Sequence, residues 1–204
     1  MEDEEDNGTS KEVVSTLGNH IYFYTEVSDK SALQAVKAIK KLNDEIRISH
    51  LCIGNDSVYD DDDGDIDSKV NKYSPIYFHI NSSGGSYFAG IAIIDAIRLS
   101  KVPVYTIGEG AIASMASEIF LSGKKRIMTK NSYILIHELR TFMSGTFSNL
   151  LDEYENCKLF MDKTIKFYKD HSKIPNKELL NILKKDIWID ADKCLKWRLT
   201  DKVI

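Results

Sequence analysis

Two consecutive units, each made of a strand, a glycine turn and a helix, restrict the fold of this chain more than any other feature. The first has an apolar strand at 76–80 and an apolar helix from about 88 to 99. The second has a strand at 102–107 and an apolar helix at 115–121. Glycines between strand and helix permit backbone angles that other residues resist. This succession predicts an α/β fold with its ligand chemistry at the strand ends, where the turns gather.

Apolar periodicity predicts further elements on both sides of these units. We expect strands at 20–27, 126–129, 133–136, 186–189 and 200–204, and helices at 29–46, 148–171, 176–185 and 191–197. The helix at 148–171 is long for a globular protein. Its apolar stripe fits packing either on its own core or on another subunit, and the length of the helix favours a subunit partner.

Ser114 stands where the second glycine turn meets its helix. At such a helix start, its hydroxyl can face a cleft, and the unpartnered N–H groups of the first turn can receive a developing oxyanion. The alternative is a simple helix cap, because serine is a preferred N-cap residue. His137 at the end of a strand and Asp186 after a helix supply the other parts of a Ser-His-Asp hydrolase. Each alone is more typical of a hydrogen-bonded histidine and a surface acid, and order alone is weak support.

Composition and charge exclude several classes of protein. The net charge is −4, and the lysines are spread among acidic residues, so we expect no nucleic-acid partner. No run approaches the roughly 18 apolar residues of a membrane span, and the acidic start is unlike a targeting peptide, so we expect a cytoplasmic protein without membrane contact. The 3 cysteines lack CxxC spacing, and no dinucleotide or Walker motif is present, so we expect neither a metal nor a cofactor.

We expect residues 1–18 to form an acidic, disordered tail and residues 19–204 to form one domain. An acidic polar insert interrupts that domain at 47–74. Its aspartate run does not fit a calcium loop, because Tyr59 and Val70 stand where an EF-hand needs acids.

Several motifs in register resemble the proteolytic subunit of the Clp protease, the ClpP family. Ile80-Asn-Ser-Ser-Gly-Gly-Ser86 resembles that family's I-N-S-P-G-G-S, and Gly110-Ala-Ile-Ala-Ser-Met115 resembles its G-Q-A-A-S-M. Ile136-His137 resembles its I-H, and Asp186-Ile-Trp-Ile-Asp-Ala191 resembles its D-R-F-L-S-A. The 29 positions from Gly85 to Ser114 and the 49 from His137 to Asp186 are also close to the family pattern.

The resemblance implies a role for each matched residue. Ser114 would be the nucleophile, His137 the general base and then acid, and Asp186 the group that orients the imidazole. The N–H groups of Gly85 and Met115 would form the oxyanion hole. Glycine at 84 and 85 would leave room for the substrate backbone.

The resemblance also implies a crotonase-like α/β fold, a spiral of ββα units with a long projecting helix. It implies stacked pairs of heptameric rings that enclose the active sites, polypeptide substrates, and a AAA+ ATPase (unfoldase) that feeds them. Ser83 replaces the family's proline, Thr141-Phe142 replaces its Gly-Gly, and Arg198 stands where a helix-ending glycine is expected. The acidic start does not resemble the family's ATPase-docking loops.

Three alternatives stay open. The first is an ATPase-independent relative, such as a viral maturation protease in infected-cell cytoplasm, or a member from an organelle stroma. A second alternative is a non-catalytic ring subunit, which would have no chemical need for Ser114, His137 and Asp186 together. A third is a crotonase-type acyl-CoA enzyme, which uses oxyanion N–H groups without such a triad. Labelling by a fluorophosphonate separates the serine peptidases from the other two.

Overall fold

The computed structural model describes residues 13–52 and 73–204, so the expectations for 1–12 and for the acidic run within 53–72 lie outside the described residues. The described residues form one mixed sheet of 8 strands. The strands are β1 (Ser15–Leu17), β2 (His20–Phe23), β3 (Ile76–Ser82), β4 (Val104–Ala113), β5 (Lys125–Met128), β6 (Tyr133–Leu135), β7 (Trp188–Asp190) and β8 (Lys202–Val203). Strands β2, β3, β4, β5 and β8 are parallel neighbours, with β1 antiparallel on the β2 edge.

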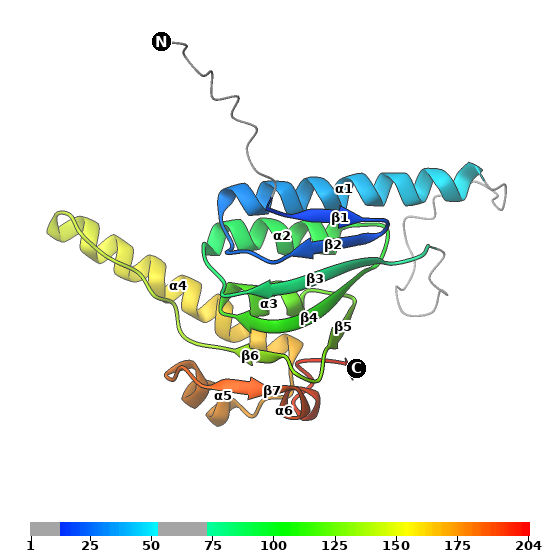
Figure 1. The fold of residues 1–204 in the computed structure, drawn as a ribbon. Coiled ribbons are helices and arrows are strands. Elements are labelled where there is room, and N and C mark those ends of the chain that lie inside the picture. The colour runs from blue at the N-terminus through cyan, green and yellow to red at the C-terminus, as the bar shows by residue number, and fades with distance from the viewer. Residues whose placement is uncertain (1–12, 53–72) are drawn as a thin grey trace, which may run out of the picture.

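Helices α1 (Asp29–Cys52), α2 (Tyr87–Leu99) and α3 (Met115–Leu121) follow β2, β3 and β4 in turn. They lie side by side along the sheet, with α2 in contact with both α1 and α3 (Figure 1). The core between these helices and the sheet contains fully buried aromatic and β-branched residues, among them Phe23, Phe78, Ile93 and Phe120. This α/β arrangement confirms the predicted fold class, and it sets the Gly84–Gly85 turn beside Ser114.

Strand β4 is longer than the sequence predicted. It was expected to end at residue 107, but it continues through Gly108 and Gly110 to Ala113. Its first half pairs with β5 and its second half pairs with β6, while β3 pairs with both halves. The left-handed φ of 65° at Gly110 lets the strand pass from one neighbour to the other. Ser114 is therefore the residue directly after the central strand.

Two expected boundaries are wrong. Residues 15–17 of the expected disordered tail form β1, which pairs with the outer edge of β2, and Val14 beside it is only 2% exposed. The strand covers a sheet edge that would otherwise expose unpaired backbone groups. Helix α1 extends to Cys52, six residues into the expected insert at 47–74, because residues 47–52 contain neither glycine nor proline to end it.

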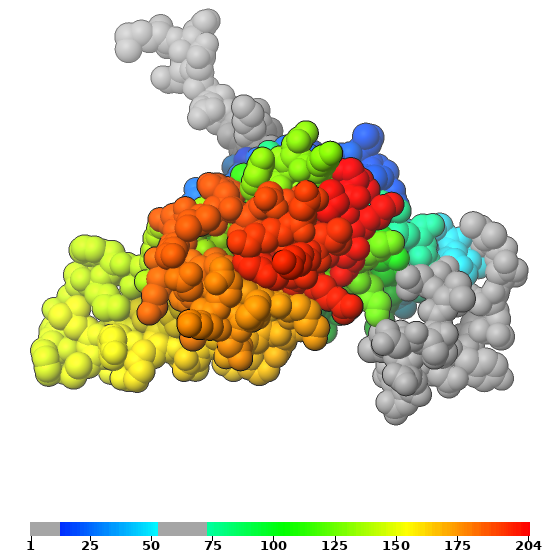
Figure 2. Space-filling view, turned by 90° about the horizontal axis from the view of Figure 1, so that it is seen from below, coloured from blue at the N-terminus to red at the C-terminus, as the bar shows by residue number. Residues whose placement is uncertain are grey.

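Helix α4 (Phe147–His171) projects from the body of the molecule (Figure 2). It begins with a capping box, in which Thr146 and Asn149 each bond to the other's backbone N–H. Its buried residues, Thr164 and Tyr168, lie near its C-terminal end. Helices α5 (Asn176–Leu183) and α6 (Ala191–Lys196) complete the fold. None of the helices in the described ranges is long and apolar enough to cross a membrane.

Candidate active site

Ser114 lies between β4 and α3 in a backbone conformation that serine rarely adopts. Its φ is 54° and its ψ is −128°, whereas an ordinary N-cap residue is extended. Its N–H donates to the carbonyl oxygen of Leu135 at 2.9 Å, and its hydroxyl does not cap α3, which lies wholly within the described residues. The alternative of a simple helix cap is therefore wrong. A strained serine between a strand and a helix is the geometry by which hydrolases expose a nucleophile.

Neither Gly84 nor Gly85 has room for a side chain, since Gly84 is packed against the Ser114 junction and Gly85 against the backbone of Val27. A Cβ on Gly84, whose φ is 92°, would lie 2.6 Å from Cβ of Ser114. A Cβ on Gly85, whose φ is 143°, would lie 2.2 Å from the carbonyl oxygen of Val27. We expected glycine here to make room for a substrate. The structure adds a nearer reason, which is that the protein's own backbone already fills the space.

The residues of both units line one cavity of about 210 Å³. Met115 is the first residue of α3, so its N–H belongs to a turn whose N–H groups have no partners within the helix. The cavity brings four predicted site residues together. Its lining is formed by Gly85, Tyr87, Ser114, Met115, Glu118, His137, Glu138, Leu139, Arg140, Thr164 and Tyr168.

His137 follows β6 by two residues, and its ring has a defined tautomer. Its Nδ1 lies 2.6 Å from the carbonyl oxygen of Glu138. A carbonyl oxygen only accepts hydrogen bonds, so Nδ1 carries the proton, and Nε2 of the neutral ring carries a lone pair. This is the tautomer that a general base for a serine hydroxyl requires.

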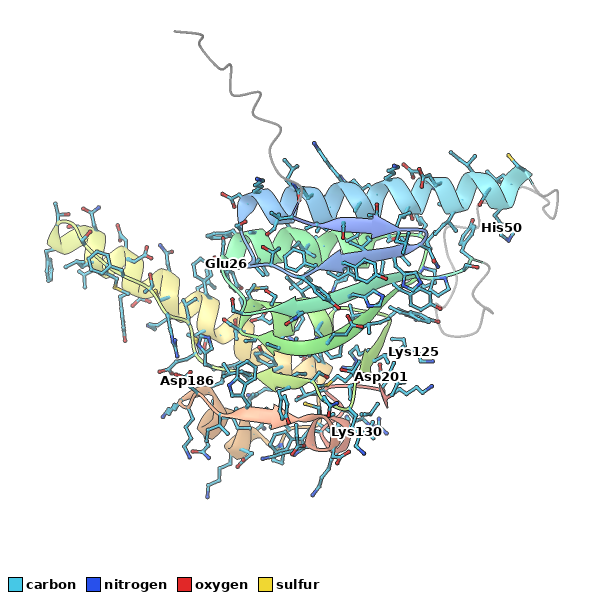
Figure 3. The ribbon with its side chains drawn as sticks, in the orientation of Figure 1. Glu26, His50, Lys125, Lys130, Asp186 and Asp201 are labelled. Atoms are coloured by element: carbon cyan, nitrogen blue, oxygen red, sulfur yellow. The ribbon has the colours of Figure 1, made fainter. Side chains whose placement is uncertain are left out.

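Asp186 is not in the cavity lining. Its carboxylate accepts two hydrogen bonds from Nη2 of Arg140, and the bond to Oδ1 is 2.6 Å long. The side chains of Arg140 and Asp186 are 66% and 59% exposed. Asp186 lies at the end of the sheet from which α4 projects (Figure 3). The structure thus places Ser114 and His137 at one cavity, whereas Asp186 forms an ion pair with a residue of the cavity wall.

Glu118 is a cavity residue that the sequence analysis missed. It lies one turn beyond Ser114 on α3, it is only 5% exposed, and its Oε1 accepts a 3.1 Å hydrogen bond from Oγ1 of Thr164. Burial raises the pKa of its carboxyl to about 7, although the hydrogen bond from Thr164 acts in the opposite direction. The signal in the sequence was a single charged residue within a mostly apolar helix.

No group of three or more histidine, cysteine, aspartate or glutamate side chains within residues 13–52 and 73–204 is placed to hold a metal ion. The three cysteines are free thiols. Cys194 is buried, and this burial raises its pKa to about 12, so it stays protonated at neutral pH.

Comparison with known proteins gives a consistent result. A sequence model of the family described as Clp protease matches residues 67–204. An ATP-dependent Clp protease proteolytic subunit from Deinococcus radiodurans is 33% identical over 136 residues, which cover 66% of this chain and 67% of that relative. ATP-dependent Clp protease proteolytic subunit 2 from Treponema denticola is 34% identical over 131 residues, or 63% of this chain and 66% of the relative. The chain thus spans about two thirds of the length of these relatives.

Proposed function

Because the chain belongs to the Clp protease family, a family of serine peptidases, we propose that it is a serine endopeptidase with Ser114 as its nucleophile. The observation that carries this proposal is the strained, uncapped backbone of Ser114 at a cavity that it shares with His137 and Gly85. An ordinary N-cap serine would need neither the strain nor the cavity.

The reaction follows from the chemistry of these groups. Oγ of Ser114 attacks the peptide carbonyl carbon while Nε2 of His137 takes the hydroxyl proton. The N–H groups of Gly85 and Met115 donate to the oxyanion of the tetrahedral intermediate. His137 then protonates the leaving amine, which departs as the carbonyl re-forms. Water, activated by the same nitrogen, hydrolyses the acyl-enzyme and restores Ser114.

Asp186 is the third member of the proposed triad, and it must exchange Arg140 for His137 to take this role. In the structure Nδ1 of His137 donates to the carbonyl oxygen of Glu138 instead. An ion pair as exposed as Arg140–Asp186 contributes at most about 1 kcal/mol, so this exchange is energetically accessible. In the exchanged state Asp186 would accept from the same Nδ1–H and stabilise the imidazolium that forms during attack.

We further propose that the chain acts on polypeptides as a homo-oligomer of stacked heptameric rings, supplied by a AAA+ unfoldase. The support is the projecting half of α4, which exposes large apolar side chains to solvent, including Phe147, Leu151, Tyr154 and Leu159. An unpartnered apolar surface of this kind is typical of an interaction site. The relatives' names include ATP dependence, which motivates the ATPase proposal. A cytoplasmic location stays a prediction.

A fluorophosphonate probe tests the nucleophile directly. Wild-type protein should be labelled on Ser114, and Ser114→Ala should lose all labelling, whereas the control Ser122→Ala at the other end of α3 should keep it. Assembled rings that resist the probe would indicate the non-catalytic ring subunit instead.

A further inference from the structure

The cavity beside Ser114 contains a buried acid that the proposed reaction does not use. Ser114 precedes α3 and Glu118 is one turn further on, so the two side chains lie on the same face of the helix. Both line the cavity of about 210 Å³, together with Tyr87 from α2 and Thr164 from α4. A side chain that enters this cavity beside Ser114 therefore meets the carboxyl group of Glu118.

Glu118 has no cationic partner among the described residues. Its hydrogen-bond donor is the neutral hydroxyl of Thr164, at 3.1 Å. Tyr87 and Tyr168, the two tyrosines at this site, stay neutral. Burial is the main cause that raises the pKa of each hydroxyl, and the nearby charge of Glu118 raises it further. The hydroxyl of Tyr168 already bonds to Oγ of Ser117 at 2.7 Å.

Three further polar or charged residues, His137, Glu138 and Arg140, face the cavity from the segment after β6. Arg140 is held by Asp186, and His137 by the Glu138 carbonyl. None of the three forms an ion pair with Glu118 within the part of the chain that the structure describes. The Glu118 carboxyl thus has unused capacity for a positively charged ligand.

A structural role explains Glu118 poorly. An acid near the N-terminus of a helix is stabilised by the helix dipole, which lowers a carboxyl pKa. Here burial outweighs that effect, since the pKa is raised to about 7. An apolar residue at this position of a mostly apolar helix would avoid the desolvation cost. Local choices that conflict with the fold in this way are most often found at functional sites.

We propose that Glu118 is a specificity-determining residue that selects substrates with lysine or arginine at the residue whose carbonyl Ser114 attacks. This inference rests on the proposed function and adds the substrate class. The side chain next to the attacked carbonyl enters the cavity adjoining Ser114. A long cationic side chain fits about 210 Å³, and its head donates charge-assisted hydrogen bonds to the carboxylate.

The selection depends on pH. Lysine keeps its charge up to about pH 10, whereas Glu118 changes from neutral to ionised as the pH rises through about 7. The preference for a cation should therefore be weak at pH 6 and strong at pH 8.5. Without the Thr164 hydrogen bond, the lysine preference should begin at a higher pH, because that bond favours the ionised form of Glu118.

The test uses two fluorogenic peptides that differ only at this residue, one with lysine and one with norleucine, which has nearly the same length without the charge. Wild-type kcat/KM should favour lysine by about tenfold or more at pH 8.5, a factor typical of close charge pairs, and by less at pH 6. The ratio of the two rates cancels any titration of the common base. Glu118→Gln should remove the preference, and the control Glu45→Gln, an exposed residue of α1, should keep it.

In Thr164→Val, the lysine preference should appear at a higher pH than in the wild-type protein. A purely structural role of Glu118 would not produce this shift. Ser114→Ala protein supplies a second one, because its affinity for the two peptides reports the cavity without catalysis. Tighter binding of the lysine peptide to this variant at pH 8.5, lost in Ser114→Ala/Glu118→Gln, supports the inference even if no peptide is cleaved. Equal binding and equal turnover at both pH values would overturn it. Cleavage that depends on Ser114 without a lysine preference would overturn the inference and leave the proposed function intact.

Discussion

Replacing Arg140 by glutamine tests whether the ion pair with Asp186 competes with the proposed triad. The change removes the cation that binds the Asp186 carboxylate and frees that carboxylate for Nδ1 of His137. Because both side chains are more than half exposed, the pair contributes about 0.2–1 kcal/mol. The fraction of molecules with an assembled triad, and hence kcat/KM, should rise by between about 1.4-fold and 5-fold.

The assay is hydrolysis of the norleucine peptide, since a neutral side chain does not respond to the charge of residue 140 itself. Asp186→Asn should lower kcat by a factor on the order of 10⁴, and Arg140→Gln should give no gain in that background. Arg47→Gln on α1 is the matched control. A lower kcat/KM in Arg140→Gln, or an equal rise in kcat/KM with and without the Asp186 carboxylate, would show that the ion pair does not compete with the triad.

Three further predictions concern stability and assembly. Gly84→Ala should lower the free energy of unfolding by about 1–3 kcal/mol, because the new Cβ would lie 2.6 Å from Cβ of Ser114. Gly18 also has a positive φ but open space around it, so Gly18→Ala should lower the free energy of unfolding by less. Denaturant titration of both variants measures the difference. Deprotonation of Glu118 should lower the free energy of unfolding by up to about 3 kcal/mol as the pH rises from about 4.5 to about 7, because the folded protein binds this proton more tightly than the unfolded chain does. Urea titrations at a series of pH values measure this slope, and Glu118→Gln should flatten it. Phe147 and Leu151 of α4 are 77% and 51% exposed, and replacing both by glutamate should reduce the oligomer mass measured by light scattering. The melting temperature of the isolated subunit should stay unchanged. An unaltered oligomer mass would exclude this part of α4 from the interface between subunits.

The sequence predicted elements that are set by local chemistry. Helix α3 begins and ends at the predicted residues, because the apolar run defines it. Helix α4 begins within one residue of the prediction, where Thr146 and Asn149 form a capping box. The expectation that Arg198 occupies a glycine-like position came from the resemblance to the family, and its φ of 53° confirms it.

Features that depend on distant contacts were not predictable in this way. The continuation of β4 through Gly110 depends on pairing with β5 and then with β6. The ion pair between Arg140 and Asp186 joins residues 46 positions apart, and a motif match gave no indication of it. The role of Glu118 depends on the cavity that α3 and α4 form together. The triad assignment itself stays a prediction, because its acid and its base bond to other partners in the structure.

The central claim is that Ser114 makes this chain a peptidase. Its most direct test is turnover of a short fluorogenic peptide by the purified protein and by Ser114→Ala, with the oligomer mass recorded on the same samples. We expect turnover by the wild-type assembly and its loss in Ser114→Ala at unchanged mass. Turnover that survives in Ser114→Ala, or a well-formed wild-type ring that cleaves nothing even with a AAA+ unfoldase added, would contradict it.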